Sequence, residues 1–407
     1  MSLQPQADPL SASFRLRPWL ALAGLSLLFF LITAGTFTSL GVVLPDMVGQ
    51  LHWSWSEAGF GYTLLALSCG LASYAPTLLV RRFGVRITLY AGSFMMVAGY
   101  LLNAQCGPIG YFWAGAVLLG VGFALTAIIP GTFVLARSFS HKSTAIGLYY
   151  TAGALGGVAG PILYSLARSQ TLDWRGYWLA LAAGMAVTGA LAAFAIDPTT
   201  DVVRPDHKVD EPVAPGDWSV GDALRAPQFW IITAAYTAYL LCETSLNGLS
   251  VAHMTSRGLT PAVAAGMLSL QALVNAGARA VAGWLGERID PRRLAIFAMA
   301  LVTAGIGALA VANGQILVAI AVTAVGIGYG VSYLATTVLL LNAFGRSRNL
   351  ELMSLMCLVS TLAAAGPVVG GLVKDASGGF APAFELFAVV AALSLAALIL
   401  MKPPVRP

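Results

Sequence analysis

Charged residues are scarce in this chain of 407 residues. Only 10% of the residues are Asp, Glu, Lys or Arg, whereas 58% are hydrophobic, and the mean hydropathy is +0.81. A soluble globular domain carries about 25% charged residues. So little charge excludes an ordinary soluble protein and indicates a chain that lies mostly within a lipid bilayer.

Paired cysteine motifs are also missing. The four cysteines, Cys69, Cys106, Cys242 and Cys357, fall in or beside different apolar segments and form no CxxC pair. We therefore expect neither a disulfide framework nor a cysteine metal site. No phosphate-binding loop, metal-ligand cluster or nucleophile triad occurs in the context that each requires. We expect no enzymatic activity, no cofactor and no metal.

Apolar stretches of about 20 residues, the length of an α-helix that crosses a hydrocarbon core of about 30 Å, recur along the chain. Glycine is frequent within them, with 44 in the chain, which is typical of closely packed helices rather than of β-barrel strands. We predict an all-α membrane protein with twelve transmembrane helices. The predicted spans are residues 19–43, 57–79, 87–104, 109–136, 143–167, 176–196, 228–252, 260–286, 293–312, 316–342, 351–373 and 380–401.

The basic residues predict the orientation in the membrane. Of the 22 Lys and Arg residues, 17 fall in the two termini and in the loops on the same side as the termini. Only Arg168, Arg175, Arg257 and Lys374 fall on the opposite side. The positive-inside rule then places both termini in the cytoplasm. The basic excess thus reports topology, and we expect no nucleic-acid partner.

One long polar segment, residues 197–227, divides six spans from six. It is rich in Pro and Asp, which favours a flexible cytoplasmic linker. The predicted parts are an N-terminal tail, a six-helix bundle, this linker, a second six-helix bundle and a C-terminal tail, at residues 1–18, 19–196, 197–227, 228–401 and 402–407.

The two halves repeat each other at a constant offset. RRFGVR at residues 81–86 matches ERIDPR at 287–292, and GVAGPIL at 157–163 matches AAAGPVV at 363–369. Four pairs in one register indicate duplication, so we predict two pseudo-symmetric halves. The matched pairs, each 206 residues apart, are Arg82 and Arg288, Arg86 and Arg292, Gly160 and Gly366, and Pro161 and Pro367.

Two six-helix halves joined by a cytoplasmic linker resemble the major facilitator superfamily, from about Trp19 to Met401. The resemblance implies secondary transport by halves that rock about a central site. It also implies gating loops that match the family signature G-x-L-x-D-R-x-G-x-R, although Arg81 stands where the family usually has Asp and Asp290 replaces a glycine. The loop residues that carry the match are Arg82, Gly84, Arg86, Glu287, Arg288 and Arg292.

Arg279 lies within a predicted span and has no acidic residue beside it in the sequence. Gln271, Asn275 and Arg279 recur at every fourth residue of QALVNAGARAVAGWL, residues 271–285. This spacing places them in one polar stripe on a helix. An arginine in the bilayer costs at least about 2.5 kcal/mol. We therefore expect the stripe to face a partner or a hydrated cavity.

Two partners for Arg279 are open. Glu243, the only acidic residue deep in the predicted spans, would form an internal ion pair with it. Alternatively, an anionic substrate would complete it in a central cavity, since a guanidinium offers a planar fork of donors that matches a carboxylate. The two alternatives are compatible if the substrate displaces Glu243 from Arg279. Glu243 is also the candidate for proton coupling, because an apolar site favours the protonated form of a carboxyl group.

The stretch NAGARAVAG, residues 275–283, resembles the eighth span of the monocarboxylate transporters and oxalate:formate antiporters. In that branch an arginine binds the substrate carboxylate, and the resemblance assigns this role to Arg279. Asn275 stands where the animal monocarboxylate transporters have an Asp implicated in proton coupling. No second cation precedes Lys374 in the eleventh span, which favours a single carboxylate, as in lactate or pyruvate, over a dianion.

The predicted function is therefore symport or antiport of small organic anions, with a proton as the candidate co-transported ion, across the inner membrane of a bacterium. Tyr329 and Tyr333, four residues apart, and Tyr150 are further candidates to bind substrate, with core packing as the alternative. Rival functions are an exporter of drug-like or siderophore-like compounds and a non-transporting membrane sensor. The sequence leaves the oligomeric state open.

Overall fold

The structure is a computed structural model that describes residues 9–139, 142–170, 172–196, 218–285, 288–345 and 349–402. Within these residues the secondary structure is helical and contains no strand. Eleven helical segments of the described chain are long and apolar enough to cross a membrane. A twelfth helix, α12 (Pro227–Ser256), is 30 residues long and falls outside that set. The predicted all-α membrane fold is confirmed.

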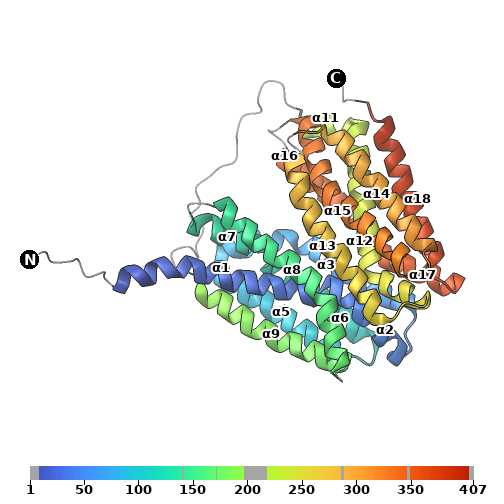
Figure 1. Cartoon of the computed structure of the whole chain (residues 1–407). Helices are drawn as coiled ribbons and strands as arrows, with labels where there is room; N and C mark the ends of the chain where they lie inside the picture. Colours follow the sequence, from blue (N-terminus) through green and yellow to red (C-terminus); the bar gives the residue numbers. More distant parts are fainter. Residues whose placement is uncertain are drawn as a thin grey trace, which may run out of the picture.

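Six spans form the first half of the molecule and six form the second (Figure 1). The first six are α1 (Pro9–Gly35) with α2 (Phe37–Leu51); α3 (Trp55–Leu71) with η1 (Ala72–Tyr74) and α4 (Ala75–Phe83); α5 (Val85–Ala104); α6 (Ile109–Thr126) with α7 (Ile128–Ser138); α8 (Lys142–Ser169); and α9 (Trp174–Ala195). The second half begins with the short α11 (Val220–Arg225) and continues with α12; α13 (Pro261–Leu285); α14 (Pro291–Val311); α15 (Gln315–Phe344); α16 (Asn349–Ser360) with η2 (Thr361–Ala365) and α17 (Gly366–Ser377); and α18 (Ala381–Leu400).

Local sequence signals set where several of these helices begin. Ser54 and Glu57 form a capping box at the start of α3, in which each side chain accepts a hydrogen bond from the other's backbone N–H. Asp290 caps α14, and Pro291 follows it at the first helical position, where a proline costs no hydrogen bond. The repeat is visible here, since α5 and α14 begin at Val85 and Pro291, which are 206 residues apart.

The first span is longer than the sequence predicted. The predicted span ended at residue 43, but after a single break at Thr36 the chain stays helical through α2 to Leu51. Pro45 lies inside α2, and such prolines are tolerated in membrane helices because neighbouring helices satisfy the freed backbone groups. Asp46, which the predicted boundary left in a loop, therefore lies on a transmembrane helix.

The last residues of the predicted linker are folded. Residues 197–217 lie outside the described residues, but from Trp218 onward the chain packs on the second half. The Trp218 ring is buried and its centroid lies 5.3 Å from that of Phe344. Ser219 caps α11 by accepting a hydrogen bond from the backbone N–H of Asp222. Residues 218–226 thus belong to the second half, because a buried tryptophan anchors them.

The two halves meet along a seam of glycines that we call the glycine seam: Gly41 on α2, Gly59 on α3 and Gly371 on α17. A Cβ atom added at Gly41 would overlap the backbone oxygen of Asn247, and one added at Gly59 would overlap that of Pro367. A Cβ atom at Gly371 would overlap the backbone oxygen of Trp55. Only glycine lets the backbones of the two halves approach this closely.

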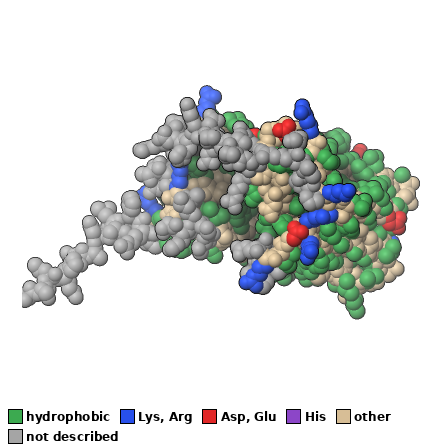
Figure 2. Space-filling view, turned by 90° about the horizontal axis from the view of Figure 1, so that it is seen from above, with side chains coloured by type: hydrophobic (Ala, Val, Ile, Leu, Met, Phe, Trp, Pro, Cys, Tyr) green, Lys and Arg blue, Asp and Glu red, His purple; other side chains and the backbone are tan. Residues whose placement is uncertain are grey.

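The halves converge at one end of the molecule and diverge toward the other. In Figure 1 they come together near α2, α13 and α17, and they splay apart toward the end where the chain enters α11 and leaves α18. Figure 2 views the molecule from that end, where several Lys and Arg side chains are exposed among hydrophobic ones. The helices of the two halves therefore touch at the glycine seam and lie apart at the opposite end.

Candidate functional site

Arg279 lies on α13 with its guanidinium over two tyrosine rings of α15. The Cζ atom is 5.3 Å from the ring centroid of Tyr329 and 5.5 Å from that of Tyr333. The Nε atom donates a hydrogen bond of 3.0 Å to Oδ1 of Asn275, one turn earlier on α13. Arg279 is exposed, and it makes no ion pair with any residue that the structure describes. The predicted cluster of Arg279, Asn275 and the two tyrosines therefore exists, with its charge uncompensated by a contacting carboxylate.

Glu243 is buried on α12 and is held by amides rather than by a cation. Gln271 donates from Nε2 to both carboxylate oxygens, at 3.0 and 2.9 Å, and Asn247 donates from Nδ2 to Oε1 at 3.2 Å. Among the described residues no ion pair joins Glu243 to Arg279, so the internal pair left open by the sequence does not form here. Gln271, predicted to orient substrate beside Arg279, is instead buried against Glu243.

A cavity of about 280 Å³ lies between the two halves beside Glu243. Tyr329 is part of its wall and also contacts Arg279, so the cavity and the arginine are adjacent. The remaining wall is mostly apolar and comes from both halves. We call this space the central cavity; its lining residues are Phe37, Tyr62 and Ala66 from the first half and Leu240, Glu243, Thr244, Asn247 and Tyr329 from the second.

Asn247 was missed in the sequence, although a signal for it was present. It lies four residues after Glu243, which is the spacing that revealed the stripe of Gln271, Asn275 and Arg279. Tyr62 and Ala66 carry no such signal, because nothing in a sequence says which face of α3 meets the other half.

Tyr150 faces away from the core of the first half, whereas its neighbour Tyr149 is buried in it. The hydroxyl of Tyr149 donates to the backbone carbonyl of Ala127, and its ring stacks on Phe29 at 4.7 Å. Tyr150 is 41% exposed, and its ring centroid lies 6.4 Å from that of Phe29. Of the two tyrosines, only Tyr150 is exposed, and its binding of substrate stays a prediction.

Comparison with known proteins identifies the family. The sequence matches the model of the Major Facilitator Superfamily over residues 25–365 and again over residues 240–407. The chain belongs to the Major Facilitator Superfamily. It is similar to human monocarboxylate transporter 11, with 27% identity over 373 residues that cover 87% of this chain and 77% of that protein. It is also similar to the oxalate:formate antiporter of Oxalobacter formigenes, with 25% identity over 274 residues that cover 61% of this chain and 62% of that protein.

A solved structure confirms the superfamily fold. The nucleoside transporter NupG, in a mutant form, superposes with a TM-score of 0.77 and 12% identity, covering 94% of this chain and 99% of that one. The resemblance read from the sequence is therefore confirmed. This member of the superfamily is a transporter and not an enzyme.

In this superfamily member the arginines of the two signature loops bind equivalent sites within their own halves. Arg86 donates from Nε to the carbonyl of Ile196 at 3.1 Å, just after α9. Arg292 donates from Nε to the carbonyl of Leu398 at 3.2 Å, and from Nη2 to that of Ile399 at 2.7 Å, in the last turn of α18. A cation at a helix C-terminus satisfies free carbonyls and the helix dipole. Arg86 thus links α5 to the end of α9, and Arg292 links α14 to the end of α18, which are the third and sixth spans of each half.

The other loop residues differ between the halves of this transporter. Gly84 has a φ of 87°, which favours glycine, and Arg82 lies 5.3 Å from the ring of Phe83. The equivalent of Gly84 is Asp290, whose carboxylate accepts a hydrogen bond of 3.0 Å from the backbone N–H of Arg292. Arg288 is exposed, and Glu287 lies outside the described residues. A gating role for these loops stays a prediction.

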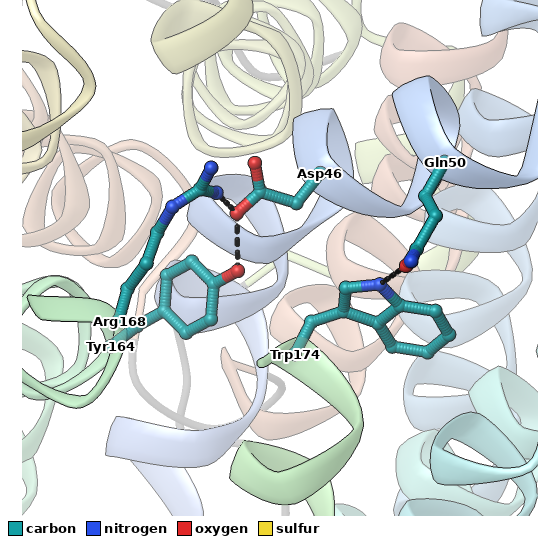
Figure 3. Close-up of polar contacts among 5 residues, drawn as sticks. All are labelled: Asp46, Gln50, Tyr164, Arg168 and Trp174. Atoms are coloured by element: carbon teal, nitrogen blue, oxygen red, sulfur yellow. Dashed lines mark hydrogen bonds and ion pairs between the residues drawn. The ribbon is translucent and has the colours of Figure 1, made fainter. Parts of the chain in front are cut away.

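A polar cluster ties α2 to α8 and α9 at the closed end of the molecule. The carboxylate of Asp46 pairs with Arg168 and accepts a hydrogen bond from the hydroxyl of Tyr164 (Figure 3). One turn further along α2, Gln50 accepts a hydrogen bond from the indole N–H of Trp174 (Figure 3). These side chains line a second cavity of about 320 Å³. All of them belong to the first half, so the cluster moves with that half.

Proposed function

We propose that this transporter carries organic monocarboxylates and that Arg279 binds the substrate carboxylate. The observation that carries the proposal is an exposed guanidinium between the halves, held by Asn275 and two tyrosine rings, with no contacting carboxylate among the described residues. An unpaired cation inside a membrane bundle is costly. A bound carboxylate offsets that cost with two parallel hydrogen bonds to the guanidinium fork.

The relatives favour the same class of substrate. The chain is similar to a protein named for monocarboxylates and to one named for oxalate and formate. Glu243 is held by neutral amides and makes no ion pair within the described chain, so the guanidinium of Arg279 keeps its donors for a ligand. One cation matches one carboxylate, and lactate and pyruvate are the simplest probes of that class.

Alternating access about the glycine seam is the mechanism that we propose. The halves touch at the glycine seam and diverge toward the end where the basic residues are exposed. By the positive-inside rule we assign that end and both termini to the cytoplasm of a bacterium, and the structure to the inward-open state. Glu243, buried beside the central cavity, is the proposed site of proton coupling.

Uptake into proteoliposomes tests the proposal. Radiolabelled L-lactate, pyruvate, formate and oxalate are offered with and without an inward proton gradient, to the wild type, to Arg279→Gln and to the control Arg257→Gln. Arg257 follows the last residue of α12, and its guanidinium donates hydrogen bonds to Oδ1 of Asn313 and to the carbonyl of Ala310. We expect Arg279→Gln to lower monocarboxylate uptake by about 100-fold or more, since a charge-assisted bidentate contact is lost, and Arg257→Gln to keep it.

Two results would overturn the proposal. If none of the four acids enters, the substrate is not a small carboxylate. If Arg279→Gln transports as well as the wild type, the arginine does not bind substrate, and an exporter of drug-like compounds becomes the better hypothesis.

A further inference from the structure

Glu243 is surrounded by hydrogen-bond donors. Nε2 of Gln271 donates to both carboxylate oxygens, at 3.0 and 2.9 Å, and Nδ2 of Asn247 donates to Oε1 at 3.2 Å. Each of these contacts uses a lone pair of the carboxylate, and none of them accepts a proton from it. Hydrogen bonds of this kind favour the ionised form of a carboxyl group. The surroundings of Glu243 thus suit a negative charge.

No cation of the described chain contacts that charge. The ion pair found among the described residues joins Arg168 to Asp46 in the first half. Arg279 contacts Asn275 and two tyrosine rings but no carboxylate of the described chain. Two opposite charges inside a membrane bundle therefore each lack a contacting partner, and each is costly in that state. A ligand that carries one charge of each sign would compensate both.

Glu243 and Arg279 border the same space. Glu243 lines the central cavity, with 7% of its surface exposed, and shares its wall with Tyr329, whose ring centroid lies 5.3 Å from Cζ of Arg279. Along α13 the two charges are held one helical turn apart, because Arg279 bonds to Asn275 and Glu243 bonds to Gln271. A helical turn separates these levels by roughly 6 Å along the axis.

An α-amino acid can span this separation. Its N–Cα and Cα–C bonds of about 1.5 Å place the ammonium nitrogen roughly 2.5 Å from the carboxylate carbon. A hydrogen bond of about 2.9 Å at each end extends the reach, so that the carboxylate contacts Arg279 while the ammonium contacts Glu243. A hydroxy acid such as lactate has the same reach, so distance does not distinguish the two classes. Charge does, because only the ammonium compensates an ionised Glu243.

The central cavity accommodates the side chain of such an amino acid. Its volume is about 280 Å³, and Phe37, Tyr62, Ala66 and Leu240 give it a mostly apolar wall. Arg279 is not one of the lining residues, so a carboxylate bound there leaves this volume to the remainder of the molecule. Ligand sites in proteins are commonly apolar with a few placed polar groups. An apolar side chain therefore suits this wall better than a charged one.

We infer that the transporter binds neutral α-amino acids with apolar side chains, and binds them more tightly than the corresponding acids without an amino group. The carboxylate contacts Arg279, the ammonium donates to Glu243 and the side chain occupies the central cavity. Lactate, which brings no cation, is carried with a proton on Glu243 instead. This inference rests on the proposed function, because it takes Arg279 as the carboxylate site.

Three acids with one carbon skeleton test the ammonium site. L-Leucine, L-2-hydroxy-4-methylpentanoate and 4-methylpentanoate differ only in the group on the second carbon. Isothermal titration measures their binding to the full chain in nanodiscs at neutral pH, with empty nanodiscs as the blank. We expect L-leucine to bind about tenfold to a hundredfold more tightly than the other two, as a hydrogen bond to a charged group gives. L-Leucinamide keeps the ammonium but lacks the carboxylate, and it should bind at least about tenfold more weakly than L-leucine.

Variants at the two charges assign the two ends of the ligand. Glu243→Gln keeps the shape of the side chain without its charge, and it should abolish the preference for L-leucine while 4-methylpentanoate binds nearly as it does to the wild type. Binding of that acid also shows that the variant is folded. Arg279→Gln should weaken all three acids. Glu385→Gln, the same change as at Glu243 but at an exposed position on α18, should alter none of them.

The outcomes separate this inference from the proposed function. If uptake of lactate and pyruvate depends on Arg279 but L-leucine binds no more tightly than 4-methylpentanoate, the inference is wrong and the proposed function stands. If the preference for L-leucine survives in Glu243→Gln, Glu243 does not bind the ammonium and the inference is wrong. If no acid binds or enters, or if all three bind equally well to Arg279→Gln, the proposed function fails first.

Discussion

Asp375 of α17 is joined to Ser56 of α3, across the two halves, by a hydrogen bond of 2.8 Å from the backbone N–H to a carboxylate oxygen. The other carboxylate oxygen accepts from the backbone N–H of Trp55 at 3.2 Å. Both donors belong to the first turn of α3, where unpaired N–H groups and the helix dipole attract an anion. The contact holds the halves together at the closed end.

Asp375→Asn should loosen that end. The amide keeps one acceptor but loses the charge, and because the site is exposed the loss is about 1 kcal/mol, or about fivefold in the equilibrium between the two states. The measure is the rate at which an impermeant maleimide, added from outside, labels a cysteine placed at Ala66 in a variant without other cysteines. The matched control is Glu385→Gln, an exposed carboxylate on α18. Equal rates for Asp375→Asn and the wild type would contradict the prediction.

Gly41→Ala should hinder closure at the glycine seam. A Cβ atom at Gly41 overlaps the backbone oxygen of Asn247, whereas one at Gly49 on the same helix meets no atom within 4 Å. Overpacking of this kind costs about 1–3 kcal/mol, so Gly41→Ala should favour the state open at the seam and lower the turnover of transport. Gly49→Ala should transport normally. Similar turnover in the two variants would show that the seam tolerates a methyl group.

Arg279→Lys should fall between the wild type and Arg279→Gln. Lysine keeps the charge but lacks the planar fork and the broad stacking surface over Tyr329 and Tyr333. We expect KM for the transported acid to rise about tenfold with a smaller change in kcat, measured from the concentration dependence of uptake. A lysine variant with wild-type KM would mean that charge alone is recognised.

Glu243→Gln should separate transport from the proton gradient. The amide keeps the shape of the side chain, and its oxygen can still accept from Gln271 or Asn247, but it cannot carry a proton. We expect stimulation of uptake by an inward proton gradient to be lost, while exchange of labelled for unlabelled substrate continues. If the gradient still drives accumulation in this variant, the coupling proton binds elsewhere.

Substitutions of Asp46 and Arg168 should have non-additive effects on the free energy of unfolding. Asp46→Asn and Arg168→Gln each break the pair, and the double variant should be less unstable than the two effects added together. Because the side chain of Arg168 is 53% exposed, we expect a coupling of about 1 kcal/mol. Thermal unfolding of the three variants in detergent measures it. Strictly additive shifts in Tm would contradict the coupling.

The spans could be predicted from the sequence because crossing a bilayer demands length and apolar content, both of which can be read along one dimension. The predicted end of the first span was wrong for a related reason. Asp46 is a rare residue type in membrane helices, so the predicted span ended before it, yet α2 continues to Leu51 and Asp46 is paired with Arg168 and Tyr164. Residues 218–226 were likewise assigned to the linker, because the pocket that buries Trp218 comes from distant parts of the chain.

Half of the candidate site could be predicted in the same way. Contacts along one helix follow from spacing, so Arg279 lies beside Asn275 as expected. Contacts between helices do not follow from spacing, and Gln271 turns to Glu243 rather than toward Arg279. The wall of the central cavity could be predicted only in part: Glu243 and Tyr329 were candidates, whereas Tyr62 and Ala66 come from α3, whose face toward the other half cannot be derived from spacing.

At the glycine seam, the contact between the halves does not depend on the side chains that line the central cavity. At Gly41, Gly59 and Gly371 the opposing atoms belong to the main chain, which every residue type shares, while the walls that would recognise a ligand are side chains such as Ala66 and Leu240. The side chains that line the central cavity can therefore be substituted without changing the backbone contacts between the two halves.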